Sequence, residues 1–260
     1  MVRISGFALT EGPDTDKIVV KTGGGTVKLK VLLTIPRTDN KIEEMAHFLQ
    51  EGASLTVFPE GFLHNEILTP ALKLTAGRDG LVISGFKHWT PKGVYEKALV
   101  IENGRIVGEY TKCILTKTEQ AKGKLPGPAI HCVDTRLGRI GIPICYEIHF
   151  PEVSRVMALD SPFLLLNLIG TGMYHAQQYS QWTALARARA IENEVYVVGC
   201  SHCAGEIPLA FAYSPSGELL GELVNTHGSL SLELDTAESA NRPLGYLDDR
   251  LPTYFTRLCC

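Results

Sequence analysis

Residues 28–58 carry the pattern that most constrains the fold of this chain: a strand, a helix and a second strand in direct succession. Residues 28–35 and 55–58 are apolar runs of strand length, and the stretch between them repeats apolar side chains at helical spacing. Two strands joined through a helix pair in parallel, because the crossover returns the chain to the same edge of the sheet. The sequence therefore predicts an α/β fold with parallel strands.

The connecting helix is expected to begin after Asn40 and to end at Gly52. Asn40 with Glu43 three residues later predicts a capping box, and a glycine after the last apolar position is a common helix end. The second strand is expected to stop at Pro59, directly before Glu60.

Later segments predict antiparallel pairs. Asn103 and Gly104 lie between two strand-like runs, which is a strong signal for a type I′ hairpin. Further expected elements are a hairpin at residues 210–224 and buried strands at 163–168 and 196–200 that flank a helix at 176–193. Parallel strands together with hairpins favour an α/β sandwich with mixed sheets.

Bulk properties limit the classes of function. The chain has 260 residues, 45% of them hydrophobic, so a single domain over residues 1–260 is expected, with residues 1–27 as a peripheral arm or hairpin. A net charge of −3 without a basic stripe argues against nucleic-acid and membrane-surface partners. No apolar stretch is long enough to span a bilayer and no signal-peptide pattern is present, so a soluble cytoplasmic protein is expected.

Seven cysteines are an odd number for a disulfide framework, and reduced thiols are expected. Cys200 and Cys203 have the spacing of a metal or redox pair, but a lone pair cannot complete a four-ligand zinc site. We interpret them as marking a strand end and expect neither a metal nor a cofactor.

Four polar residues lie just past strand-like runs, where α/β folds collect their chemistry. They are Glu60, Lys112, Glu119 in the following loop, and Cys145. Each alone has a structural explanation: a helix cap, a solvated strand end, a surface charge and a buried thiol, respectively. Cys145 differs because it lies on a predicted strand-to-helix turn, where neighbouring N–H groups point toward whatever the sulfur attacks.

Taken in order, these residues and their neighbours resemble the nitrilase, or carbon–nitrogen hydrolase, superfamily from residue 28 onward. The motifs that carry the resemblance are Pro59-Glu60, Tyr110-Thr111-Lys112, the block at 145–152, Trp182 with the helix at 186–193, and the segment 214–218. The resemblance implies a four-layer α-β-β-α sandwich with two mixed sheets. It also implies a homodimer or a higher homo-oligomer.

The residue types explain how such a site would hydrolyse an amide. The reaction needs a thiolate, a proton shuttle and groups that stabilise the developing oxyanion. Cys145 is the expected nucleophile and Glu60 the expected base, while Lys112 and the backbone N–H of Tyr146 are expected to face the oxyanion. By resemblance, Glu119 hydrogen-bonds the substrate or holds Lys112 in place.

Two residues depart from the usual family pattern. Glu147 replaces a common aspartate and His149 replaces a common arginine. We expect Glu147 to pair with Arg187 or Arg189. His149 lies four residues after Cys145, but we expect it to be a bystander because the chain leads away from the sheet edge there.

The substrate is a small molecule whose identity the sequence leaves open. Gly170 and Thr171, in the loop at residues 169–174, are expected to form one wall of the substrate pocket. This loop offers no arginine to clamp a carboxylate, which favours a neutral amide. Nitrile hydrolysis by the same residues, and a non-catalytic binding protein of the same fold, are the alternatives.

Overall fold

The computed structural model describes residues 28–240, 242 and 244–259, and within them it contains two sheets of six strands each. The predicted arm at residues 1–27 lies outside the described residues, and the single domain over residues 1–260 stays a prediction. The first sheet has the order β12-β1-β2-β3-β4-β5 and the second has the order β11-β10-β9-β8-β7-β6.

The first sheet mixes parallel and antiparallel pairs. Strands β1, β2 and β3 are parallel, whereas β12, β4 and β5 join in antiparallel pairs. The bounds are β1 (Lys28–Ile35), β2 (Leu55–His64), β3 (Leu81–Thr90), β4 (Gly93–Glu102), β5 (Arg105–Thr111) and β12 (Gly228–Asp235).

The second sheet is mixed in the same way. Strands β7, β8 and β9 are parallel, and β6, β10 and β11 pair antiparallel. The bounds are β6 (Val133–Thr135), β7 (Gly138–Gly141), β8 (Leu164–Ile169), β9 (Tyr196–Ser201), β10 (Leu209–Tyr213) and β11 (Leu219–Val224).

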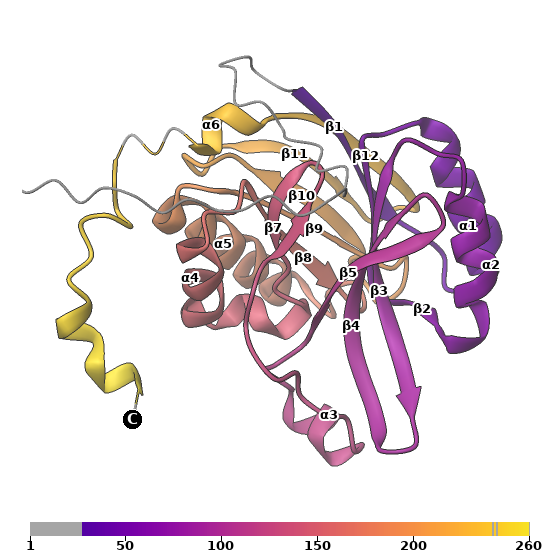
Figure 1. Ribbon diagram of the computed structural model, residues 1–260, viewed down its shortest axis with the longest axis horizontal. Coiled ribbons are helices and arrows are strands. Elements are labelled where there is room, and N and C mark those ends of the chain that lie inside the picture. Colours follow the sequence, from indigo (N-terminus) through magenta and orange to yellow (C-terminus); the bar gives the residue numbers. More distant parts are fainter. Residues whose placement is uncertain (1–27, 241, 243, 260) are drawn as a thin grey trace, which may run out of the picture.

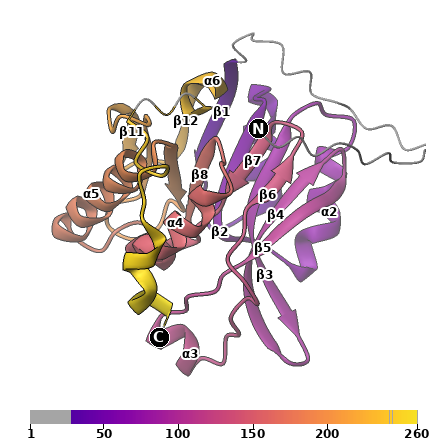
Figure 2. The same cartoon turned by 60° about the vertical axis from the view of Figure 1, so that its left-hand side comes forward.

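Helices cover the outer faces of the two sheets (Figure 1). Helices α1 (Lys41–Phe48) and α2 (Asn65–Thr75) lie against the first sheet, and α4 (Pro151–Leu159) and α5 (Ala176–Asn193) lie on the side of the second. Figure 2 shows the same layers after rotation, with α5 and α2 on opposite sides. The structure confirms the predicted four-layer α-β-β-α sandwich.

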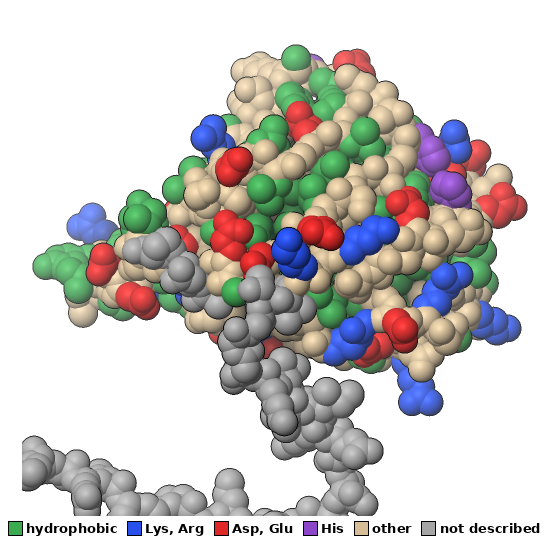
Figure 3. Space-filling model, turned by 90° about the horizontal axis from the view of Figure 1, so that it is seen from above, with side chains coloured by type: hydrophobic (Ala, Val, Ile, Leu, Met, Phe, Trp, Pro, Cys, Tyr) green, Lys and Arg blue, Asp and Glu red, His purple; other side chains and the backbone are tan. Residues whose placement is uncertain are grey.

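Short helical segments complete the chain. Helices α3 (Lys117–Ala121) and α6 (Thr236–Ala240) are single turns, and the 3₁₀ segments are η1 (Leu49–Glu51), η2 (Cys145–His149) and η3 (Pro252–Cys259). No helix in the described part of the chain is long and apolar enough to cross a membrane. Acidic and basic side chains are interspersed on the face shown in Figure 3.

Two hydrophobic cores stabilise the layers. The larger one joins both sheets and reaches α5 through Trp182, Ala186 and Ala190. The smaller one joins the first sheet to α1 and α2. Alternate side chains of a strand point to opposite faces, so β1 supplies Leu33 to the larger core and Leu32 to the smaller.

Several predicted elements are confirmed. The first strand and the long helix α5 have the predicted bounds, and Asn103 and Gly104 turn between β4 and β5 with φ of 46° and 75°. Gly52 ends the first helical segment in the left-handed region, with φ of 61°. Strand β9 ends at Ser201, beside the Cys200–Cys203 pair, as expected.

Two predictions at the ends of elements are wrong. Asn40 adopts a left-handed conformation with φ of 49° and makes no capping hydrogen bond with its side chain, so there is no capping box at this helix. Strand β2 does not stop at Pro59 but continues to His64, because an irregularity in its pairing with β3 takes up the bend at Glu60 and Gly61.

Candidate active site

Lys112 lies at the centre of a buried cluster of charged side chains. It follows β5 directly, and its side chain is only 1% exposed. Its Nζ donates hydrogen bonds to Oε1 of Glu60 at 2.8 Å and to Oε1 of Glu119 at 2.9 Å. A buried ammonium needs such partners, because an unpaired charge in the interior is strongly destabilising. The structure thus brings together three of the four polar residues identified in the sequence.

The backbone around Glu60 is shaped to place its carboxylate. Gly61 has a φ of 67°, and the pairing of β2 with β3 shifts register here. A Cβ atom at Gly85 on β3 would lie 2.4 Å from the Cα of Glu60, so only glycine fits beside this bend. The Nε2 of His202 donates a hydrogen bond to the carbonyl oxygen of Glu60 at 3.0 Å. Its Nδ1 is buried without a hydrogen-bond partner among the described residues.

Glu119 was expected in a loop, but it lies in the first turn of helix α3. Thr116 and Glu119 form a complete capping box: the Glu119 N–H donates to Thr116 Oγ1, and the Thr116 N–H donates to Glu119 Oε2 at 2.9 Å. Oε1 accepts from both Lys112 and Lys124, each at 2.9 Å. Both carboxylate oxygens are therefore engaged by the protein, and Glu119 is oriented to hold Lys112.

Cys145 begins η2 directly after Ile144, with a φ of 49° that is unusual for a residue with a side chain. The charges of Glu60 and Lys112 and the backbone N–H of Gly170 act on its thiol. Asn167 on β8 donates from Nδ2 to the Cys145 carbonyl at 3.2 Å, and Trp182 holds that amide at 2.9 Å. These contacts join the thiol to the cluster around Lys112.

Glu147 does not pair with Arg187 or Arg189, so that prediction is wrong. Its buried carboxylate accepts hydrogen bonds from the hydroxyl of Tyr110 and from the backbone N–H groups of residues 113, 114 and 144. Arg189 instead donates to the Ile148 carbonyl and to Glu192. Glu147 thereby ties the turn that carries Cys145 to the segment that carries Lys112.

His149 points into a packed aromatic environment. Its ring lies edge-on to Trp182 with centroids 4.6 Å apart, and its Nδ1 contacts the Tyr146 carbonyl at 3.1 Å. Burial lowers the pKa of His149, which favours the neutral ring. The contacts are those of a packing residue.

A family model described as carbon-nitrogen hydrolase matches residues 27–238. The chain belongs to the carbon–nitrogen hydrolase family. Among curated relatives of this hydrolase, an (R)-stereoselective amidase from Pseudomonas is 30% identical over 211 residues, which are 76% of this chain and 74% of that amidase. Other relatives align over less of their length, for example 53% of the omega-amidase of Saccharomyces cerevisiae.

Solved structures share the fold of this carbon–nitrogen hydrolase. A carbon-nitrogen hydrolase from Helicobacter pylori G27 superposes with a TM-score of 0.81 at 19% identity, over 90% of this chain and 99% of that one. An amidase from Nesterenkonia, with the acetamide moiety of fluoroacetamide on its active-site cysteine, superposes with a TM-score of 0.72 at 20% identity, over 88% of this chain and 95% of that one.

Charges and burial in the cluster oppose one another. Burial disfavours the Lys112 ammonium, but Glu60, Cys145 and Glu119 outweigh it and raise the pKa of Lys112 above its usual value. Burial likewise opposes the Glu119 carboxylate, yet Lys112 and Lys124 lower the pKa of Glu119 to about 2. Both groups are therefore charged at neutral pH in this hydrolase.

The Cys145 thiol experiences opposing effects as well. Burial and the negative charge of Glu60 raise its pKa, whereas Lys112 and the Gly170 N–H lower it. The net direction is upward, so the resting thiol keeps its proton until a base removes it. Glu60 is the carboxylate whose charge acts on this thiol.

The residues predicted to line the substrate pocket lie beside this cluster or next to it in the chain. A Cβ atom at Gly170 would come within 2.6 Å of Glu60 Oε2, so glycine is required for the carboxylate to fit. Thr171 follows and is partly exposed, and Tyr146 is partly exposed with its ring edge-on to Phe150.

Sequence reasoning missed His202, Asn167 and Lys124. His202 lies within the Cys200–Cys203 segment, where a histidine at a strand end is a signal that the sequence offers. Asn167 is a polar residue inside an apolar strand, and such residues generally have a buried partner. No local pattern singles out Lys124, because its partners are Glu96 on strand β4 and Glu119 on helix α3.

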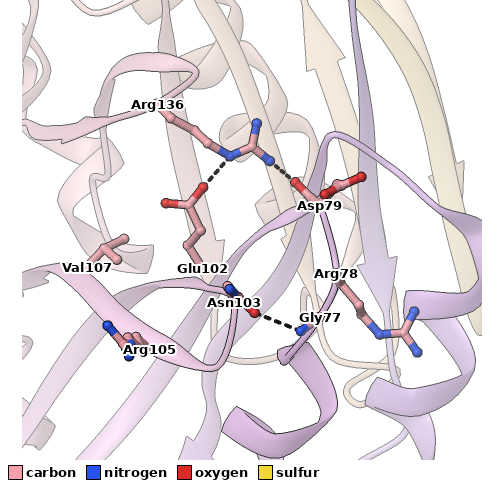
Figure 4. Close-up of a pocket in the computed structure, with 8 residues that line it drawn as sticks. All are labelled: Gly77, Arg78, Asp79, Glu102, Asn103, Arg105, Val107 and Arg136. Carbon is pink, nitrogen blue, oxygen red and sulfur yellow. Dashed lines mark hydrogen bonds and ion pairs between the residues drawn. The ribbon is translucent and has the colours of Figure 1, made fainter. Parts of the chain in front are cut away.

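A surface cavity of about 690 Å³ lies apart from this cluster, at the turn between β4 and β5. Figure 4 shows Arg136 directed at Glu102 and at the carbonyl of Asp79, and Asn103 directed at the N–H of Gly77. None of the residues that line it belongs to the cluster around Lys112. In the described residues no group of three or more His, Cys, Asp and Glu side chains is placed to hold a metal ion.

Proposed function

We propose that this carbon–nitrogen hydrolase is a thiol amidase that hydrolyses a small neutral amide through a thioester on Cys145. The observation that carries the proposal is the buried hydrogen bond of 2.8 Å between Lys112 and the Glu60 carboxylate, whose charges both act on the Cys145 thiol. A nucleophile, a base and a fixed positive charge are the parts that this reaction needs.

In the first step Glu60 takes the thiol proton and the sulfur attacks the carbonyl carbon of the amide. The carbonyl oxygen becomes an oxyanion, which the Lys112 ammonium and the Tyr146 N–H stabilise. Protonated Glu60 then gives its proton to the nitrogen as the carbon–nitrogen bond breaks, and ammonia or an amine leaves. The acyl group remains on Cys145 as a thioester.

In the second step Glu60 removes a proton from water, and the hydroxide attacks the thioester carbon. A second oxyanion forms and collapses, the carbon–sulfur bond breaks, and the thiolate regains a proton from Glu60. A carboxylic acid leaves and the starting state returns. Glu119 acts in both steps by holding Lys112, since its own oxygens are already occupied.

The amide substrate is supported by the relatives. The Pseudomonas and Saccharomyces cerevisiae proteins carry the names of amidases, and the Nesterenkonia amidase carries an acetamide moiety on its cysteine. Gly170 and Thr171 offer no charge for a substrate carboxylate, which favours a neutral acyl group. The cytoplasmic location stays a prediction from the sequence.

We also infer that the protein forms a homodimer or a higher homo-oligomer. Large apolar side chains of the C-terminal segment are exposed in the single chain, and a second copy of the chain could cover them. They are Leu244, Tyr246, Leu251, Tyr254, Phe255 and Leu258.

The test of the reaction is ammonia release from a panel of small amides and nitriles by the intact protein, Cys145→Ala and Cys203→Ser. Loss of the nucleophile is expected to reduce kcat by about 10³-fold or more. Cys203→Ser, a matched change at a partly exposed thiol, should keep the original rate. Mass analysis after substrate mixing should find the acyl group on the peptide that contains Cys145.

Three outcomes would change the conclusion. Equal rates for the intact protein and Cys145→Ala would exclude this nucleophile. Release from nitriles but not from amides would assign nitrile hydrolysis to the same residues. No release from any compound would favour a non-catalytic binding protein.

A further inference from the structure

Glu96 is a buried carboxylate behind the proposed catalytic residues. It lies on β4 with 2% of its surface exposed, and its carbonyl oxygen accepts a hydrogen bond from the N–H of Lys112 at 2.9 Å. Its Oε1 forms an ion pair of 2.7 Å with Lys124, which in turn holds Glu119 at 2.9 Å. Its Oε2 is buried without a hydrogen-bond partner among the described residues.

These contacts form a chain of alternating charge through the site. The order is Glu60, Lys112, Glu119, Lys124 and Glu96. The two ends of the chain are both carboxylates, and the charge of Glu60 acts on Glu96. Both groups are carboxylates, so the repulsion between their negative charges is mutual.

We propose that Glu96 is a positioning residue for the proposed amidase reaction: it holds Lys124 against Glu119, and its negative charge acts on Glu60. The inference rests on the proposed function in that Glu60 is taken as the base. Glu96 touches neither the thiol nor a substrate, so it acts through its neighbours.

Charged groups approach Glu96 from four elements. Glu60 comes from β2, Lys87 from the directly opposed position on β3, and Lys124 from the segment after α3. Lys41 from α1 is near enough for the charge of Glu96 to act on it. Burial and Glu60 raise the pKa of Glu96, and Lys124 opposes them.

The geometry separates this role from ordinary structural pairing. The ion pair of Lys97 and Glu109 on β4 and β5 has one half-exposed partner, so it is worth little and leaves distant groups unchanged. Glu96 shares its cation with Glu119, so a change at position 96 reaches Lys112 through two further contacts. A purely structural glutamate would affect stability without moving the titration of Cys145.

The experiment measures the rate at which iodoacetamide alkylates Cys145 as a function of pH, read from the mass of the Cys145 peptide. Glu96→Gln removes a negative charge from beside Glu60, so the midpoint should move to lower pH by about one unit. Lys124→Met removes a positive charge, so the midpoint should move to higher pH. Glu96→Asp should restore most of the original profile, and Glu109→Gln should leave it unchanged.

Amide hydrolysis is measured in parallel as a second readout. Glu96→Gln is expected to lower kcat about tenfold with little change in KM, because the residue does not touch the substrate. Thermal unfolding of each variant shows whether it is folded. If Glu96→Gln does not fold, the alkylation midpoint of Lys124→Met still tests the proposal: a shift to higher pH supports it, and an unchanged midpoint contradicts it.

Equal alkylation profiles for the intact protein, Glu96→Gln and Lys124→Met would overturn the proposal, as would shifts of the same sign in the two variants. Alkylation of Cys145 needs no amide hydrolysis. The role of Glu96 can therefore be contradicted without contradicting the proposed amidase function, and the reverse also holds. Shifts of opposite sign in a protein that hydrolyses no amide would support the role of Glu96 and contradict the proposed function.

Discussion

Glu60 and Glu147 are two buried glutamates near Cys145, and they are held in different ways. Glu60 faces the Lys112 ammonium at 2.8 Å. Glu147 accepts from a tyrosine hydroxyl and three backbone N–H groups, with no ion pair to it among the described residues. The first carboxylate belongs to a network of charges and the second to a network of neutral donors.

The difference indicates what each region is built to do. A carboxylate that faces a cation and a thiol can exchange a proton with the thiol, because the Lys112 ammonium stabilises the negative charge on either group. A carboxylate that is saturated with N–H and O–H donors is fixed in place as an acceptor. The cluster around Lys112 is therefore suited to chemistry, and the turn around Glu147 to holding Cys145, the proposed nucleophile.

Lys112→Met tests the charged region, and the largest effect is expected here. Glu60 and Glu119 would lose the cation between them, and loss of one partner from a buried ion pair costs about 3–5 kcal/mol of stability. Loss of the charge that we propose to stabilise the oxyanion should also reduce kcat by about 10²–10³-fold. Urea unfolding and amide hydrolysis measure the two effects.

Lys97→Met is the matched control for this prediction. Lys97 forms an ion pair of 2.6 Å with Glu109, whose side chain is 49% exposed. Its removal should cost at most about 1 kcal/mol and leave kcat unchanged. Similar losses in the two variants would contradict the special status of the Lys112 cluster.

Glu147→Gln tests the neutral region and should have a smaller effect. The amide oxygen can still accept from the donors that now meet Oε1, but the NH₂ group would face the N–H of Ile144, which now donates to Oε2 at 2.8 Å. One lost acceptor and one opposed donor should cost about 3 kcal/mol in urea unfolding. A variant as stable as the intact protein would show that the turn needs no charged acceptor.

The two possible capping boxes show how far the sequence alone could lead. Asn40 with Glu43 and Thr116 with Glu119 have the same pattern, yet only the second pair forms a box. Asn40 is left-handed, and the neighbouring Glu44 bonds to Arg37 and His227 instead, which are tertiary contacts. Glu119 was identified from its order along the chain in the family resemblance, whereas the formation of a capping box depends on residues distant in the chain.

The same reasoning explains why the partner of Glu147 was mispredicted. Strand order, the Asn103-Gly104 turn and helix α5 follow from periodicity and turn chemistry within short windows. Three of the four donors to Glu147 are set by how β5 and the segment after it meet η2, 33 to 37 residues away in the chain. Opposite charge was a reasonable expectation, but saturation by neutral donors is equally able to satisfy a buried carboxylate.

His202 provides the smallest of the predicted effects, because it supports the charged region through a neutral contact. Burial lowers the pKa of His202 to about 4, from an ordinary value of 6.5. Its Nε2 carries the hydrogen that bonds the Glu60 carbonyl, so protonation would place a charged N–H at Nδ1, which is buried without a partner in the described residues.

The sign of the pH effect follows from this lowered pKa. The stability that neutral His202 provides is fully present above the unfolded value of 6.5 and is lost as the pH falls toward the folded value of about 4. Between about pH 7 and about pH 5 the free energy of unfolding should fall by roughly 2 kcal/mol from this group alone. His202→Asn, measured by urea unfolding at both pH values, should remove most of that fall, whereas the exposed His131→Asn should keep it. An equal fall in both variants would mean that His202 is not the titrating group, and that the neutral contact behind Glu60 adds nothing to the pH response of the charged cluster.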